Sequence, residues 1–414
     1  MEEYNRIDIQ QICSHICSGG TPKSTVAEYY DGNIPWLNTK EINFNRIYET
    51  EKTITEEGLN NSSAKWIPAN SVIVAMYGAT AGKTAITKIP LTTNQACCNL
   101  TIDSTKADYR FVYYALFNDY SYLASLTNGG AQQNLNAQQI KEFEIPFPSL
   151  EEQKRIADIL SSIDDKIELN RRINENLEQK AVLLFKKWFI EFDNSSKNML
   201  ETRFGLVPES FKLLKNGELP LVVTDYVANG SFASLKANVT LYQEPNYAYF
   251  IRNTDLKSGT FEVFVDEHSY NFLSKSTLYG GEIIISNVGD VGSVFLCPKL
   301  DKPMTLGNNI IMLRPKQENL RYYLYIWFKS LYGQSLIQGI KGGSAQPKFN
   351  KTDFKNLPIF LPPDDLLEQF HQIVKPMFEL IDENNTENQA LTRTRDTILP
   401  RLMSGELDVS DIEL

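Results

Sequence analysis

The sequence lacks any long apolar segment. Its 414 residues contain no apolar run near the roughly 18–20 residues that span a membrane. The N-terminal stretch MEEYNRIDIQ also lacks the basic and then apolar pattern of a signal peptide. With 42% apolar and 22% charged residues, the composition predicts a globular cytoplasmic protein that does not associate with membranes.

Residues that commonly bind metals are scarce. The chain has three histidines and five scattered cysteines, and without a secretion signal we expect these thiols to be reduced. Cys13 and Cys17 could share one face of a helix, but no second pair of ligands lies near them in the sequence. The sequence therefore predicts neither a metal site nor a cofactor.

Familiar catalytic motifs are missing as well. There is no Gly-x-Ser-x-Gly, His-Glu-x-x-His or Gly-x-Gly-x-x-Gly sequence, and no Asn-Pro-Pro-aromatic tetrad of amino-methylating enzymes. We expect the paired carboxylates at Glu151-Glu152, Asp164-Asp165 and Asp364-Asp365 to serve helix ends or a solvated helix face. The chain is therefore predicted to be non-catalytic.

One motif suggests an enzyme. Gly78–Thr84 (GATAGKT) resembles a phosphate-binding loop, but three residues separate its glycines where that loop needs four. The later segment Gly289–Ser293 (GDVGS) lacks the Lys-Thr pair and carries an acid. A nucleotide-dependent enzyme is therefore the weaker alternative. We prefer a tight loop that approaches a DNA backbone, with Lys83 and Thr84 as contacts.

A long helix is predicted in the middle of the chain. Residues 151–190 contain no proline or glycine, and apolar residues recur at alternating three- and four-residue steps, as in a coiled coil. Such a helix would be roughly 60 Å long at about 1.5 Å per residue, so its apolar stripe needs a partner. The seam consists of Ile156, Leu160, Ile163, Ile167, Asn170, Asn174, Leu177, Ala181, Leu184 and Trp188.

A second coiled-coil segment, Leu366–Leu402, repeats this seam. Five of its positions lie 214 residues after Ile156, Leu160, Asn170, Asn174 and Trp188. We expect Pro376 to kink this helix and Pro400 to end it or bend its last turn. The whole seam consists of Phe370, Val374, Met377, Ile381, Asn384, Asn388, Leu391, Arg395, Ile398 and Leu402.

The segments before the helices repeat too, at offsets of 211–214 residues. Phe250–Leu256 parallels Trp36–Ile42, and Ile283–Gly289 parallels Val72–Gly78, so the chain is a tandem duplication. The predicted fold class is α+β. Two similar globular α/β domains, residues 1–150 and 191–365, are joined by two long antiparallel coiled-coil helices, residues 151–190 and 366–414, as a pseudo-twofold repeat.

Antiparallel packing about a pseudo-twofold would bring the four seam asparagines into one hydrogen-bonded layer, which would fix the helix register. The alternative is that each asparagine points to solvent from the seam edge. The predicted helix-pair interface consists of Ile156, Leu160, Ile163, Asn170, Asn174, Leu177, Val374, Ile381, Asn384, Asn388 and Leu391.

The net charge of −10 argues mildly against nucleic acid, but the charges are unevenly distributed. Between Arg314 and Lys355 there are eight basic residues against Glu318 and Asp353. This local excess predicts either a phosphate-facing surface or an ordinary solvated face.

Polar residues suited to reading DNA recur at equivalent places in the two domains. Asn and Gln can bond adenine, and Arg and Lys can bond guanine or phosphate. For any single residue, ordinary turn chemistry is the alternative. The predicted DNA-binding residues are Thr21, Lys23, Asn38, Thr39, Lys40, Lys83, Thr84, Asn94, Gln95, Gln132, Gln133, Arg252, Asn253, Thr254, Asn308, Asn309, Lys341, Gln346 and Lys348.

Over its whole length the chain resembles the specificity subunit of a Type I restriction–modification system. The resemblance rests on a domain, a proline-punctuated strand and a long helix, in that order and twice. Asn229-Gly230-Ser231 departs from the Gly-Gly-Thr-Pro that the second copy might have carried. The segments that carry the resemblance are Gly19–Pro22, Gly129–Gln133, Ile145–Ile156, Leu184–Phe189, Leu357–Pro363, Glu368-Gln369 and Ile398–Leu407.

The resemblance implies a function and partners. Each domain would read one half of an asymmetric, bipartite site in double-stranded DNA, and the helices would fix the gap between the halves. They would also dock two copies of the modification subunit, which carry S-adenosylmethionine and methylate adenine. A restriction subunit would supply ATP-driven translocation and cleavage. From the residues alone, a two-headed scaffold that binds proteins remains the alternative.

Overall fold

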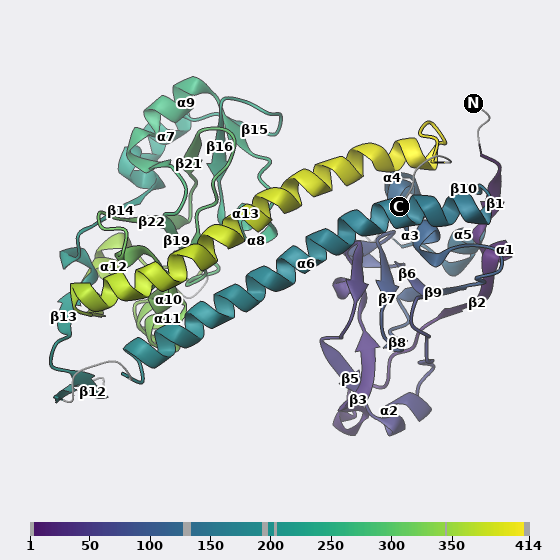
Figure 1. The fold of residues 1–414 in the computed structure, drawn as a ribbon, viewed down its shortest axis with the longest axis horizontal. Helices are drawn as coiled ribbons and strands as arrows, with labels where there is room; N and C mark the ends of the chain where they lie inside the picture. The colour runs from purple at the N-terminus through teal and green to yellow at the C-terminus, as the bar shows by residue number, and fades with distance from the viewer. Residues whose placement is uncertain (1–3, 127–133, 193–197, 203–204, 344–345, 410–414) are drawn as a thin grey trace. The chain divides into compact units, whose positions relative to one another are not determined.

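The computed structural model shows two compact units, and each unit includes parts of two long helices (Figure 1). It describes residues 4–126, 134–192, 198–202, 205–343 and 346–409. The first unit comprises Met1–Leu169 and Glu387–Leu414, and the second comprises Asn170–Thr386.

In the first unit, a sheet of order β2-β9-β6-β7-β4 has both faces covered. Val72 and Val74 share a core with α3 and the long helix α6 (Leu150–Phe189), whereas Ile73 and Ala75 face the opposite core, as alternation along a strand requires. The smaller sheet has the order β5-β3-β8, and β1 pairs with β10. The elements are β1 Arg6–Asp8, α1 Ile9–Ile12, β2 Cys13–Ser18, β3 Tyr30–Leu37, β4 Asn45–Ile47, β5 Lys52–Ile54, α2 Glu56–Asn60, β6 Val72–Ala75, β7 Thr84–Thr87, β8 Thr92–Thr93, β9 Cys97–Ile102, α3 Tyr109–Asn118, α4 Tyr120–Ser125, α5 Ala137–Lys141, β10 Glu144–Pro146 and the 3₁₀ turns Ala27–Tyr29, Thr39–Glu41 and Gly78–Thr80.

The second unit repeats this plan. Its central sheet has the order β14-β22-β19-β20, beside a five-stranded sheet β15-β17-β16-β21-β18. Ile283 and Ile285 share a core with α10, and Ile284 faces the other sheet. The elements are β11 Met199–Thr202, β12 Gly205–Pro208, β13 Lys212–Lys215, β14 Leu221–Asp225, α7 Phe232–Asn238, β15 Leu241–Tyr242, β16 Ala248–Ile251, α8 Asn253–Ser258, β17 Phe264–Val265, α9 Glu267–Phe272, β18 Thr277–Leu278, β19 Ile283–Ser286, β20 Val294–Leu296, β21 Met304–Leu306, β22 Ile310–Pro315, α10 Leu320–Lys329, α11 Leu331–Gly339, α12 Lys351–Asn356, β23 Pro358–Leu361 and the 3₁₀ turns Asn216–Glu218, Tyr226–Asn229 and Ser274–Ser276.

Strand pairing confirms the tandem repeat. β3 pairs in parallel with β8, and β16 pairs in parallel with β21. β6 lies between β7 and β9, and its counterpart β19 lies between β20 and β22, with all four pairings antiparallel. The predicted fold class is therefore correct. Cys13 and Cys17 do not share a helix face, because both lie on strand β2.

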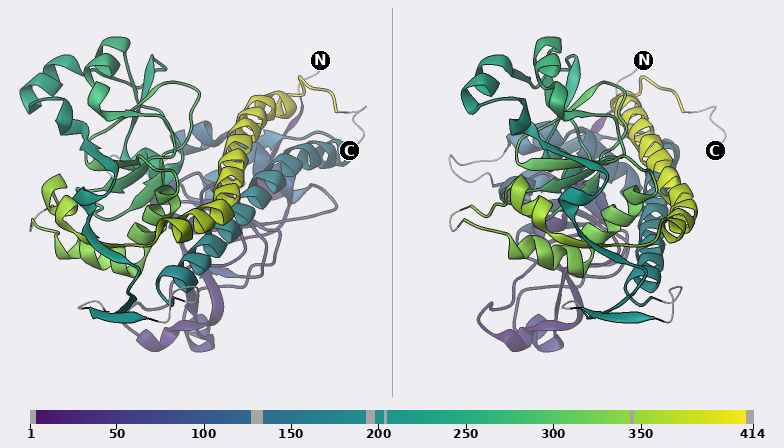
Figure 2. Two further views of the ribbon diagram at one scale, coloured as in Figure 1. Left: turned by 60° about the vertical axis from the view of Figure 1, so that its left-hand side comes forward. Right: turned by 90° about the vertical axis from the view of Figure 1, so that its left-hand side faces the viewer.

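The two long helices are α6, Leu150–Phe189, and α13, Asp364–Met403. In each unit their segments run side by side in opposite directions (Figures 1 and 2). Asp364 and Asp365 occupy the first turn of α13, as expected for carboxylates near a helix N-terminus. Pro400 does not end this helix, which continues to Met403, and Gly405 follows in the left-handed region with φ +76°. Pro376 also lies within the continuous helix.

The helix pair contributes to the core of each unit. In the second unit Phe185 and Phe189 pack with Phe370, beside the predicted seam residues Leu184 and Trp188, which are only half-buried. This one-residue shift follows because a straight helix drifts by about 20° per heptad from a seven-residue repeat. Every predicted interface residue is buried or half-buried, namely Ile156, Leu160, Ile163, Asn170, Asn174, Leu177, Val374, Ile381, Asn384, Asn388 and Leu391.

Among the residues that the structure describes, no helix is long and apolar enough to cross a membrane.

Candidate nucleic-acid interface

In the first unit, three backbone contacts gather loops at the end of β6. The Met76 N–H donates to the carbonyl of Ala96 over 2.8 Å, and the Leu135 N–H donates to the carbonyl of Met76 over 2.8 Å. Tyr77 forms an isolated β-bridge with Asn134. These contacts define the first loop cluster, which consists of residues 38–45, 76–83, 94–96 and 134–135.

The second unit has the same three contacts at the end of β19. The Asn287 N–H donates to the carbonyl of Asn309 over 3.1 Å, and the Phe349 N–H donates to the carbonyl of Asn287 over 3.0 Å. Val288 forms a β-bridge with Lys348. The second loop cluster consists of residues 252–257, 287–293, 308–309, 341–343 and 346–349. One backbone framework therefore presents two different sets of side chains.

A glycine opens the tight turn in both clusters. Gly78 has a φ of +76° and Gly289 a φ of +77°, a region that glycine adopts without steric cost. Apart from the glycine and its two chain neighbours, no described residue has an atom within 4 Å of the Cβ position that an added side chain would take at either site. The backbone of each turn is thus open to close approach by a large ligand.

Several predicted residues of the first cluster are held by local bonds. The Lys83 ammonium donates to Asn43 Oδ1 over 2.7 Å and lies 5.9 Å from the centre of the Phe44 ring. Thr21 and Gln95 are both exposed, and their side chains bond each other. Lys23 is exposed as well.

Turn chemistry accounts for the next predicted group. The Asn38 side chain accepts the Lys40 N–H, and Glu41 bonds back to the Asn38 N–H, so these residues form a capping box around Thr39. The Lys40 ammonium pairs with Glu51. Asn38 and Thr39 are half-buried and Lys40 is exposed.

Two predicted DNA contacts in the first unit are wrong. Thr84 is fully buried in β7, and Asn94 is 8% exposed, with its side chain accepting the Ala96 N–H over 3.2 Å. A side chain enclosed in this way cannot reach a base edge. The sequence misled here because Asn and Thr serve turns and buried strands as readily as surfaces.

Two carboxylates of the second cluster bind residues that were predicted to contact DNA. Asp290 accepts bonds from Lys257 over 2.6 Å and from Asn253 over 3.5 Å, and Lys257 and Ser293 lower the pKa of this carboxyl. The Arg252 guanidinium forms a bidentate contact with the Asp255 carboxylate, with hydrogen bonds of 2.6–3.2 Å. Arg252 and Asn253 are half-buried, and their side chains already form hydrogen bonds within the protein.

The remaining predicted residues of the second cluster are exposed. Asn309 has a positive φ of +65°, which asparagine tolerates in turns. Gln132 and Gln133 lie outside the described residues. The exposed set consists of Thr254, Asn308, Asn309, Lys341, Gln346 and Lys348.

The basic excess between Arg314 and Lys355 is reduced by ion pairs inside the protein. Arg314 bonds Glu282, which is buried, over 2.9 Å, and Lys351 bonds Asp225 over 3.1 Å. Arg321 and Lys329 also have acidic partners. Only part of this segment can therefore face phosphate.

The structure also rules out the nucleotide-binding interpretation of Gly78–Thr84. A phosphate-binding loop leads into a helix, and its Ser or Thr hydroxyl reaches a bound Mg²⁺. Here the segment leads into strand β7, and the Thr84 hydroxyl is buried in that strand.

Sequence reasoning missed two residues of the clusters. Tyr77 is 43% exposed beside the open Gly78, and Lys257 is the ion-pair partner of Asp290. The tandem repeat could have pointed to Tyr77, because it aligns Tyr77 with Val288 and so places both residues directly before the glycine of the turn.

In the helix pair, the seam asparagines bond across the helices. Asn384 Nδ2 donates to Asn174 Oδ1 over 2.7 Å, and Asn174 Nδ2 donates to Asn385 Oδ1 over 3.0 Å. Asn170 is fully buried. The bonding thus includes Asn385, which lies outside the predicted seam.

Known proteins share this architecture. A family model described as "Type I restriction modification DNA specificity domain" matches residues 1–179 and 224–393. The Type I restriction enzyme MjaIX specificity subunit of Methanocaldococcus jannaschii is 28% identical over 417 residues, covering 98% of this chain and 94% of that protein. The HindI specificity subunit of Haemophilus influenzae is 25% identical over 349 residues, covering 70% and 74%.

A solved S subunit of a Type I restriction–modification system from M. genitalium has the same fold, with a TM-score of 0.54, 20% identity and 96% coverage of each chain. The two matched segments correspond to the two halves of the tandem repeat. The chain belongs to the family of Type I restriction–modification specificity subunits, which are non-catalytic, and it carries two target-recognition domains.

Proposed function

We propose that this chain reads a bipartite, asymmetric site in double-stranded DNA, one half with each target-recognition domain. One observation carries the proposal: the two loop clusters have the same backbone framework and different side chains. Equal frameworks suit the same task, and different side chains select different sequences.

The clusters offer suitable chemistry for this task. Lys83, Lys341 and Lys348 suit phosphate contacts, which position a protein on DNA without reading its sequence. The open Gly78 and Gly289 turns let the DNA backbone approach. Base reading then falls to the exposed amides and hydroxyls, namely Gln95 with its hydrogen-bond partner Thr21 beside the first cluster, and Thr254, Asn308, Asn309 and Gln346 in the second.

The helix pair would set the gap between the two half-sites. α6 contributes residues 150–169 to the first unit and 170–189 to the second, and α13 contributes to both as well. A matched insertion of seven residues, between Arg171 and Leu177 and at the equivalent place in α13, keeps the seam facing inward. It lengthens each helix by about 10 Å, so the preferred gap should grow by about three base pairs. An unchanged gap would refute this role.

The partners are also part of the proposal. The chain would dock two copies of a methyltransferase subunit, which carry S-adenosylmethionine and methylate adenine, and a restriction subunit. Co-expression followed by native mass spectrometry should give two methyltransferase subunits per chain. A different ratio would overturn that stoichiometry.

The decisive experiment is to sequence methylated bases in a host that carries the assembled system, and to titrate the complex with the site so identified. We expect adenine methylation within an asymmetric site of two parts, and binding that weakens as salt rises. A complex that binds no DNA would instead support a scaffold that binds proteins.

A further inference from the structure

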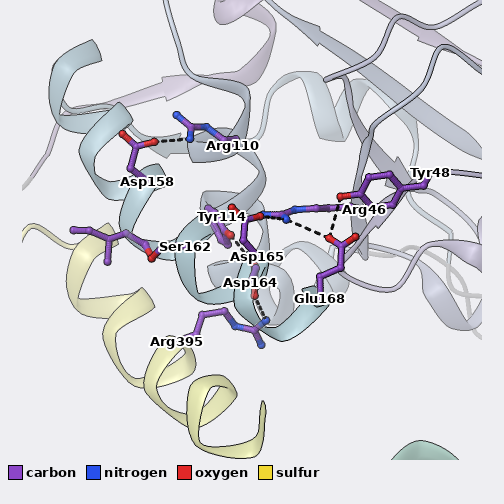
Figure 3. A network of polar contacts seen from close by, with 11 residues as sticks. Arg46, Tyr48, Arg110, Tyr114, Asp158, Ser162, Asp164, Asp165, Glu168 and Arg395 are labelled. Atoms are coloured by element: carbon purple, nitrogen blue, oxygen red, sulfur yellow. Dashed lines mark hydrogen bonds and ion pairs between the residues drawn. The ribbon is translucent and has the colours of Figure 1, made fainter. Parts of the chain in front are cut away.

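Polar side chains of the first target-recognition domain contact α6 along one face of that helix (Figure 3). The Arg46 guanidinium on β4 bonds Asp165 and Glu168, the latter over 3.3 Å. Tyr48 donates its hydroxyl to Glu168 over 3.0 Å. Arg46 is 13% exposed, so water reaches its guanidinium poorly.

A second group of contacts lies nearer the start of α6 and comes from α3. Arg110 Nη1 donates to Asp158 Oδ1 over 2.5 Å, and Tyr114 Oη donates to Asp164 Oδ2 over 2.6 Å. In these contacts the donors belong to the domain and the acceptors to the helix. We call the set the anchoring network; it consists of Arg46, Tyr48, Arg110, Tyr114, Asp158, Asp164, Asp165 and Glu168.

Asp164 joins three elements. Besides Tyr114 of α3, it accepts a bond from Arg395 of α13 over 2.8 Å, and the Arg395 guanidinium lies 4.9 Å from the centre of the Phe117 ring. Asp164 is 16% exposed and Arg395 13%. The sequence predicts Asp164-Asp165 at a helix end or on a solvated helix face, and for Asp164 both alternatives are wrong, because it lies in the middle of α6 and the domain covers it.

The second unit makes the equivalent contact with stacked rings. Phe378 of α13 stands 214 residues after Asp164, and Tyr322 stacks on it with ring centres 4.4 Å apart and planes 6° apart. His371 of the same helix also stacks against Tyr322, with ring centres 5.5 Å apart. At this position the tandem copies therefore differ in chemistry, charged in the first and aromatic in the second, although Lys329 of α10 also pairs with Glu178 of α6 in the second unit.

A charged network constrains direction as well as position. Its acceptors extend from Asp158 to Glu168, which is about 15 Å along the helix axis, so the domain is fixed at two separated points. Guanidinium–carboxylate contacts also require a defined geometry, unlike apolar packing.

We propose that the anchoring network, with Arg46 as its central cation, sets the angle at which the first domain is held on α6, and so determines how strictly one gap length is selected. This inference rests on the proposed function. Arg46 and its partners are positioning residues that need not touch DNA. Without the Arg46 charge, the domain can turn on α6 and reach its half-site at gaps one base pair shorter or longer.

The test uses the full chain assembled with its methyltransferase subunits and DNA that carries the methylated site. Dissociation constants are measured for the native gap and for gaps changed by one base pair. In Arg46→Gln we expect the preference for the native gap to fall about fivefold, as expected for loss of a partly buried ion pair. Preference among single-base changes in either half-site should stay the same.

Four further variants separate positioning from stability. Arg46→Lys keeps the charge and should restore most of the gap preference. Lys106→Gln makes the same change of charge on an exposed part of the same domain and should leave the preference unchanged, since the Lys106 ammonium contacts Asp103 and the Gln11 carbonyl, not α6. Glu168→Gln removes the charge of one of the two carboxylates that contact Arg46, and the double variant Asp165→Asn/Glu168→Gln removes both and replaces Arg46→Gln if that variant does not fold.

The outcomes distinguish the two proposals. A wild-type complex that binds no specific site overturns both the proposed function and this inference. A wild-type complex that selects one gap, together with Arg46→Gln and Glu168→Gln variants of unchanged gap preference, overturns this inference alone. A loss of affinity shared equally by all gaps also overturns it, because that result reports only stability.

Discussion

Asn384 on α13 donates a hydrogen bond of 2.7 Å to Asn174 on α6, and Asn384 is only 8% exposed. Removing this amide in Asn384→Ala should cost about 1 kcal/mol, because a cross-helix bond is lost from a nearly buried position. The melting temperature of the second unit should fall by about 2–4 °C in calorimetry. Thr386→Ala is the control, since the Thr386 hydroxyl bonds only within its own helix. Equal melting temperatures for Asn384→Ala and Thr386→Ala would contradict the prediction.

Two glycines of the first unit should respond differently to alanine. A Cβ on Gly20 would lie 2.1 Å from the Ala64 nitrogen, and backbone cannot move aside easily. Gly20→Ala should therefore cost about 3–5 kcal/mol and yield little soluble protein. The Cβ added in Gly78→Ala contacts no neighbouring residue, so the only strain comes from the φ of +76°. This variant should lose about 1–2 kcal/mol of folding stability and still fold. Soluble yield and thermal melting of both variants test this difference. Similar losses of stability in Gly20→Ala and Gly78→Ala would contradict the prediction.

Acid should loosen the contact between α10 and α6 in the second unit. Burial raises the pKa of Glu178, but bonds from Lys329 over 2.5 Å and Tyr325 over 2.7 Å outweigh it, so the net pKa is lowered from 4.5. A lowered folded-state pKa stabilises the fold above the unfolded-state pKa, and this stability is lost as pH falls through the folded value.

The matching experiment compares Glu178→Gln with wild type across pH. The variant should melt lower at neutral pH, and the difference should shrink as the pH falls below 4.5 and vanish once the pH is below the lowered folded-state pKa. Glu175→Gln, on the exposed face of the same helix, should show no such convergence. A constant difference at every pH would show that the Glu178 charge is not responsible.

The fold was predictable because periodicity and repetition are properties of the chain itself. The seam and the 214-residue offset were sufficient to identify both long helices and the duplication. Of the two outcomes expected at Pro400, an end of the helix does not occur, because near the end of a helix its missing N–H and its ring are accommodated and α13 continues to Met403. The buried position is Phe185 and not the predicted Leu184, because the apolar face of a straight helix rotates slowly relative to an exact seven-residue repeat.

The candidate site was less predictable because burial depends on tertiary packing. Asn94 and Thr84 have the side chains of DNA contacts, yet both are enclosed. Arg252 is predicted to contact DNA, but Asp255, three residues further along the chain in α8, already binds its guanidinium. The role of Asp164 was hidden because Tyr114 and Arg395, which bond it, lie 50 and 231 residues away in sequence.

Lys83 and Thr84 are adjacent in sequence but should differ in DNA binding. The Lys83 ammonium lies at the first loop cluster, 2.7 Å from Asn43, whereas the Thr84 hydroxyl is buried and has no hydrogen-bond partner among the described residues. Lys83→Ala should weaken DNA binding by the assembled complex and lower the salt slope by about one. Thr84→Val should leave binding unchanged and stability equal or slightly higher, because it removes a buried unpartnered hydroxyl. Titrations over a salt series measure both. If Thr84→Val weakened binding as much as Lys83→Ala, the loop would not act through a phosphate contact at Lys83.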